Sequence, residues 1–133
     1  MKTKAKKQAT LDLQPVYERL VEKLTTQGEP LTRAFATFLR NEVQQDVLAR
    51  ALTQKFSFSG LTYSINSLGK MEVSAIVTNQ VGLIYGVQLI ISGSYDYAEV
   101  IGYSCSCEDF YHRKRPCKHI TAFLLDLLGI SLQ

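Results

Sequence analysis

The sequence lacks several features that are typical of membrane proteins and of disulfide-rich secreted proteins. Among its 133 residues there is no tryptophan, and there are three prolines and three cysteines. The longest apolar runs, residues 83–91 and 120–130, are too short to cross a bilayer, and the second contains Asp126. The lysines near Met1 are followed by no apolar stretch, so we expect no secretory signal. These absences point away from membrane proteins and from disulfide-stapled secreted domains.

The composition is that of a globular protein. Hydrophobic residues make up 46% and charged residues 20% of a chain long enough to bury one core. An odd number of cysteines without an export signal predicts a reducing compartment, where thiols bind metals. We therefore expect a cytoplasmic protein, or a nuclear one in a eukaryote.

The net charge of +3 is distributed unevenly along the chain. Residues 1–7 carry four lysines and no acid, whereas residues 8–112 carry seven basic and eleven acidic residues. Residues 113–118 add four positive charges. We expect residues 1–10 to be a disordered basic tail, and the second basic segment to belong to the site described below.

The first half of the chain has helical spacing. Apolar residues recur with that period from Leu13 to Leu24, and again over a longer stretch from Leu31 to Leu52. The short joint between these stretches, residues 28–30, contains a glycine and a proline. The spacing predicts two helices that pack as an antiparallel pair.

From Phe56 the apolar period changes to two. It predicts about four antiparallel strands in a meander, at residues 56–65, 71–77, 83–91 and 97–104, with a bulge at Gly60. A last helix follows, in which residues 120, 123, 124, 127 and 128 form an apolar stripe and Gly129 is suited to the C-terminal stop. The predicted class is α+β, with the helical pair and sheet in residues 11–96 and a strand and helix in residues 97–133.

All three cysteines lie in one short segment, together with a histidine. Cys105 and Cys107 are separated by one residue, and so are Cys117 and His119. Three thiolates and an imidazole fill the tetrahedral shell of a structural zinc ion, which leaves no open position for a substrate. Amide groups at the start of the last helix would stabilise the resulting negative charge. The four cations between and beside the cysteine pairs would do the same: Arg113, Lys114, Arg115 and Lys118.

The cysteine segment resembles the SWIM zinc finger, whose pattern is Cys-x-Cys, a variable gap and Cys-x-His. The flanking sequences CSCEDF and PCKHI are similar to the family's Cys-Ser-Cys-Pro-Asp-Phe and Pro-Cys-Lys-His-Ile, with Glu108 where proline is usual. The resemblance covers roughly residues 97–128. It implies a strand-strand-helix finger that binds one Zn²⁺ through Cys105, Cys107, Cys117 and His119, and that is used to bind DNA or proteins.

Two other interpretations of the same residues are disfavoured. Iron–sulfur proteins of the CDGSH type also begin with Cys-x-Cys, but their last two ligands are separated by three residues, whereas here only Lys118 stands between Cys117 and His119. Nucleophilic catalysis by Cys117 needs a free base, and the metal would occupy both side chains. We expect the second histidine, His112, to be a surface residue rather than a ligand, and Phe110 to pack in the finger.

The sequence thus predicts a non-catalytic binding protein of DNA metabolism, without a membrane partner or small-molecule substrate. One expectation is sequence-independent DNA binding, in which Arg113, Lys114, Arg115 and Lys118 contact phosphates. The alternative is an adaptor without DNA binding of its own, docked on a RecA-like or helicase-like ATPase. The order of helices, strands and finger is similar to the small SWIM subunits of Shu-type complexes, which implies a RecA-like partner.

Overall fold

A computed structural model of the chain describes residue 22 and residues 29–94 and 97–129. The expected basic tail and nearly all of the first expected helix, Leu13 to Leu24, lie outside these residues. The described helices are α2 (Pro30–Glu42), α3 (Gln45–Thr53), α4 (Glu108–Arg113) and α5 (Lys118–Leu127). The strands are β1 (Ser57–Ile65), β2 (Met71–Thr78), β3 (Ile84–Ser94) and β4 (Tyr97–Cys105).

The four strands form one antiparallel meander in the order β1-β2-β3-β4, which confirms the predicted class and topology. Two of its turns are built alike, because Asn66 and Asn79 each accept two backbone N–H bonds on the side-chain oxygen. The predicted bulge lies between Ser59 and Thr62, where Gly60 has a φ of +63°. A second bulge, between β3 and β4 beside Ile90, had no signal in the sequence.

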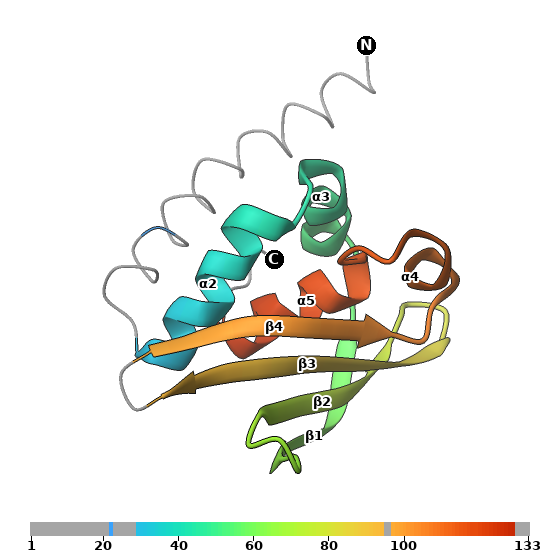
Figure 1. The fold of residues 1–133 in the computed structure, drawn as a ribbon. Coiled ribbons are helices and arrows are strands. Elements are labelled where there is room, and N and C mark those ends of the chain that lie inside the picture. Colours follow the sequence, from blue (N-terminus) through green and yellow to red (C-terminus); the bar gives the residue numbers. More distant parts are fainter. Residues whose placement is uncertain (1–21, 23–28, 95–96, 130–133) are drawn as a thin grey trace.

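The helices cover one face of the sheet, above β3 and β4 (Figure 1). α5 packs on β3 and β4 and carries α3 on its other side, whereas α2 packs directly on β4. The side chains Ile120, Phe123 and Leu124 of α5 are fully buried. They join one hydrophobic core with residues of α2, α3, β2 and β3. Because the cysteines belong to the same core, the finger is part of the main packing of the described chain.

The long helix expected from Leu31 to Leu52 is wrong in one respect, because the chain leaves helical geometry at Val43 and Gln44. Val43 has φ −99° and ψ 127°, and Gln44 begins α3 with a ψ of 150°. The apolar spacing continues through the break and contains no glycine or proline there. Tertiary packing therefore decides the break: α2 packs against β4 while α3 packs against α5.

The last described elements agree with those predicted from the sequence, except for one additional helix. α5 ends at Leu127, and Gly129 adopts a φ of +69° as expected of a helix stop. The segment between the cysteine pairs, where no helix is predicted from the sequence, contains the six-residue helix α4. Glu108 and Asp109 in its first turn and Arg113 in its last turn suit the helix dipole, a signal that was present in the sequence.

Candidate metal centre

The four sulfur and nitrogen ligands come from three element ends. Cys105 is the last residue of β4 and lies opposite Val87 of β3. Cys107 is the N-cap of α4 and Cys117 is the N-cap of α5, so His119 falls in the first turn of α5. A strand end and two helix starts therefore converge on one point.

The ligand atoms of Cys105, Cys107, Cys117 and His119 all lie within 4.8 Å of one another. His119 Nδ1 is 3.7 Å from the sulfur of Cys105 and 3.8 Å from that of Cys117. A zinc tetrahedron with Zn–S bonds of ~2.3 Å and a Zn–N bond of ~2.0 Å has sulfur–nitrogen edges of about 3.5 Å. The cluster thus has the size of a zinc shell, and Nδ1 is the nitrogen that faces its centre.

All four ligand side chains are buried, and burial and mutual contact shift the pKa values of the three thiols. The Cys105 thiol donates to the sulfur of Cys117, and this bond lowers the pKa of Cys117 to about 4 and raises that of Cys105. Burial raises the pKa of Cys107. Cys117 is therefore the thiol of the three that ionises most readily, and a divalent cation would displace protons from the sulfurs as it binds.

Backbone amides at the two helix starts stabilise negative charge on the sulfurs. The N–H of Phe110 donates to the sulfur of Cys107 at 3.4 Å. The backbone N–H of Ile120 helps to lower the pKa of Cys117 in the same way. The amide expected at the start of the last helix is thus found at α5, and α4 adds a second one that was not expected.

Aromatic rings hold the His119 imidazole in place. The ring of Tyr85 lies 4.3 Å from it, tilted by 31°, and that of Phe56 meets it edge-on at 5.5 Å. His119 Nε2 is buried and has no hydrogen-bond partner among the described residues. The imidazole is therefore oriented by packing, and its one nitrogen with polar neighbours is the one that faces the sulfurs.

The four basic residues predicted around the site have separate roles in the fold. Arg113 forms an ion pair with Asp109 at 3.1 Å, and Arg115 donates to the side chain of Gln44 at the break between α2 and α3. Lys114 caps α4 with a φ of +53°. Lys118 is half-buried in the first turn of α5. Within the described part of the chain, none of these four side chains has a hydrogen bond or an ion pair to the sulfurs, so the helix amides are the observed source of stabilisation.

The neighbouring residues follow expectation in part. His112 is exposed and stays outside the ligand cluster. Phe110 packs edge-on against Tyr103 at 6.0 Å, so it contributes to the finger's core. The ammonium of Lys114 lies over the rings of both Phe110 and Tyr111, at 5.5 and 5.1 Å. Tyr111 itself is 70% exposed, which the sequence did not indicate.

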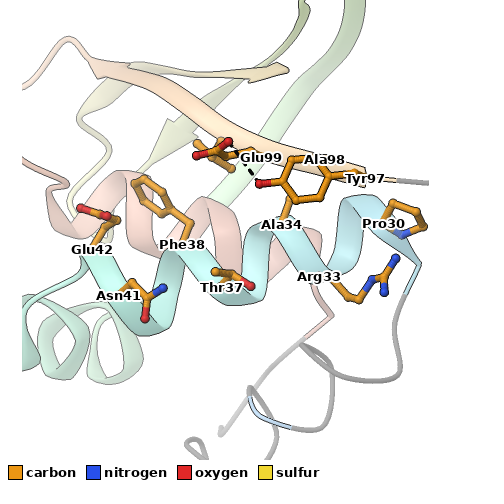
Figure 2. A pocket seen from close by; sticks show the side chains of 11 residues that line it. Pro30, Arg33, Ala34, Thr37, Phe38, Asn41, Glu42, Tyr97, Ala98 and Glu99 are labelled. Carbon is orange, nitrogen blue, oxygen red and sulfur yellow. Dashed lines mark hydrogen bonds between the residues drawn. The ribbon is translucent and has the colours of Figure 1, made fainter. Parts of the chain in front are cut away.

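A second hollow lies far from the cluster, between α2 and the start of β4 (Figure 2). It is an open groove of about 360 Å³, in which the hydroxyl of Tyr97 donates to the carboxylate of Glu99 at 3.3 Å. That contact raises the pKa of Tyr97. The groove contains neither cysteine nor histidine in its lining. The lining residues are Pro30, Arg33, Ala34, Thr37, Phe38, Asn41, Glu42, Tyr97, Ala98, Glu99 and Val100. At ~3.3 Å per residue, Tyr97 and Cys105 stand about 26 Å apart along β4, so the groove and the cluster are separate features.

The comparisons with known proteins agree with the geometry of the cluster. The family model of the SWIM zinc finger matches residues 91–127, which run from the end of β3 through β4 and α4 to the end of α5. No curated protein and no solved structure matches the chain. None of the described helices has the length and apolarity needed to span a membrane. Residues 91–127 thus match the SWIM zinc finger, and their three cysteines and one histidine form a cluster that fits one structural zinc ion.

Proposed function

We propose that the chain is a non-catalytic, zinc-stabilised protein of the cytoplasm or nucleus that binds DNA through its finger. One observation supports this above the others: four buried ligand atoms surround the metal position. Four protein ligands complete a tetrahedral zinc shell, so no coordination site is left for a water or a substrate. The metal then has a structural role, and function falls to the surface that it shapes.

The surface proposed to meet DNA is formed by α4 and the residues that follow it. Lys114 and Tyr111 stand together there, with a cation beside an exposed ring that is able to stack on an unpaired base. Arg113 is accessible, because its ion pair with Asp109 lies at the surface, and a phosphate is able to replace the carboxylate. α4 has six residues and carries no row of base-reading side chains, so the binding should be independent of sequence.

A second candidate is an adaptor that docks on a RecA-like or helicase-like ATPase. It is favoured by the engagement of Arg115 with Gln44, because this bond ties one of the four predicted phosphate contacts to the fold. With three cations left, the electrostatic contribution to DNA affinity is small. In this case the finger and its neighbouring surface bind protein, and DNA is held by the partner.

Fluorescence anisotropy with single- and double-stranded DNA tests the first proposal. Three phosphate contacts predict that log K falls with log salt with a slope of about −2.7 on duplex DNA. The double variant Lys114→Glu, Lys118→Glu should abolish binding, whereas Arg40→Glu, an exposed charge change on α2, should leave most of it.

The same series separates the two candidates. Absence of DNA binding by the zinc-loaded wild type, together with recovery of an ATPase from nuclease-treated native extract, would replace the first proposal with the adaptor. Equal loss of DNA affinity in Arg40→Glu and in the double variant would show that α4 is not the binding surface.

A further inference from the structure

The edge of the sheet formed by β1 is open over its second half. β1 pairs with β2 on one side, and no described strand pairs with its other side. The opposite edge strand, β4, is covered by α2 and α4 and carries Glu99. β1 has neither a charged residue nor a proline in its nine residues. Charges, prolines and covering helices are the usual means by which proteins protect a sheet edge from pairing. β1 has no charge and no proline, and among the described helices only α5 reaches it, at Phe58 near its start.

Two residues of β1 present both backbone and side chain at this edge. Asn66 donates its N–H to Lys70, so it faces β2. Because backbone groups alternate along an antiparallel strand, those of Ile65 and Tyr63 face away from β2, toward the open side. Beyond the bulge at Ser59 to Thr62 the register is regular through Ile65, so this part of the edge is straight enough to pair.

The side chains of the same two residues lie on the helix-bearing face, but beyond the helices. Tyr63 is opposite Val73, which is fully buried, and Ile65 is opposite Met71. Nevertheless Tyr63 is 52% exposed and Ile65 is 68% exposed. Figure 1 shows the reason: the helices lie above β3 and β4, and the β1–β2 hairpin projects past them.

We propose that β1 pairs antiparallel with β1 of a second copy of this chain, forming a symmetric dimer with one continuous eight-stranded sheet. A two-fold axis through Ser64 places Tyr63 of each copy opposite Ile65 of the other. The outward backbone groups of both residues are then hydrogen-bonded. An aromatic side chain directly opposite a β-branched one on a neighbouring strand stabilises a sheet. The two Tyr63–Ile65 pairs would also make the apolar face of the sheet continuous across the two-fold axis.

We assign the partner strand to a second copy of this chain because the β1 edge is complementary to itself. A two-fold contact sets each strand against its own sequence, and a strand without charges meets no like charge there. A partner of opposite charge would find nothing on β1 to recognise. Since β2 and β3 separate β1 from β4, the contact leaves both fingers accessible.

Analytical ultracentrifugation of the zinc-loaded full chain, from micromolar to millimolar concentration, tests the proposal. The expected mass is twice 14.9 kDa at the upper end. Ile65→Lys should sediment as a single chain. The matched control is Ile84→Lys, which changes an equally exposed isoleucine (67%) of β3 that lies outside the β1 edge, and it should remain a dimer.

Amide hydrogen exchange identifies the contact itself. The N–H groups of Tyr63 and Ile65 should exchange slowly in the wild type and fast in Ile65→Lys, although the described chain offers them no partner strand. A single-chain mass for the wild type at all concentrations would overturn the proposal, and so would a dimer that Ile65→Lys leaves intact. Slow exchange that appears only when an unrelated extended peptide is added would also overturn it, since the edge would then serve another protein.

Discussion

Replacing Cys117 by alanine tests whether the metal stabilises the whole fold or only the finger. Cys117 is fully buried and begins α5, the helix whose buried side chains reach the sheet and the other described helices. No separate core exists among the described residues for the finger alone. Loss of the metal should therefore lower the free energy of unfolding of the common core.

The magnitude follows from two contributions. Truncating one buried sulfur costs about 1–2 kcal/mol, as for other small core deletions. Structural zinc sites in finger peptides contribute about 10 kcal/mol or more at neutral pH, against a total domain stability of about 5–15 kcal/mol. In the presence of zinc, Cys117→Ala should thus cost several times more than the truncation, enough to bring the chain close to unfolding.

Urea denaturation followed by far-ultraviolet circular dichroism, with zinc and then with a chelator, separates the contributions. The difference between wild type and Cys117→Ala should be large in zinc and fall to about 1–2 kcal/mol in chelator, where neither protein holds metal. Thr121→Val changes a buried neighbour one turn further along α5 that binds no metal, so its cost should be alike in both media. An equal Cys117→Ala cost in both media would refute the ligand assignment.

Two further predictions concern the site's protons and the sheet. The raised pKa values of Cys105 and Cys107 predict that zinc binding at neutral pH releases protons, so that zinc affinity rises with pH. Calorimetry in buffers of different ionisation enthalpy measures the protons released, and release of none would contradict the prediction. In β3, a Cβ on Gly93 would overlap the backbone of β4, whereas one on Gly86 meets nothing within 4 Å. Gly93→Ala should therefore lower the free energy of unfolding by about 1–3 kcal/mol and Gly86→Ala by less than about 0.5 kcal/mol, and equal costs in a urea titration would count against the register of β3 and β4.

Most of the fold could be predicted because its signals are local. Alternation of apolar residues defines the strands, and the phase shift at Gly60 marks the bulge that the structure contains. The ligand cluster is readable for a related reason: the metal requires residue types and spacings that few other functions need. Both features depend on neighbours within a few residues.

The features that could not be predicted depend on contacts between distant segments. The break at Val43 has no glycine or proline to mark it, and it follows from packing on two different elements. Arg115 looked like a phosphate contact until the fold placed Gln44 beside it, although 71 residues separate them in the chain. The alternation that includes Tyr63 and Ile65 predicts a strand with one buried face, but only the positions of the helices reveal that this face is uncovered.

X-ray absorption spectroscopy of the purified, metal-loaded chain identifies the metal and its ligands. We expect zinc with three sulfur neighbours at ~2.3 Å and one nitrogen neighbour at ~2.0 Å, and with no water bound to the metal. Oxygen ligands, fewer than three sulfurs, or iron in place of zinc would contradict the assignment of Cys105, Cys107, Cys117 and His119 to a closed structural zinc site.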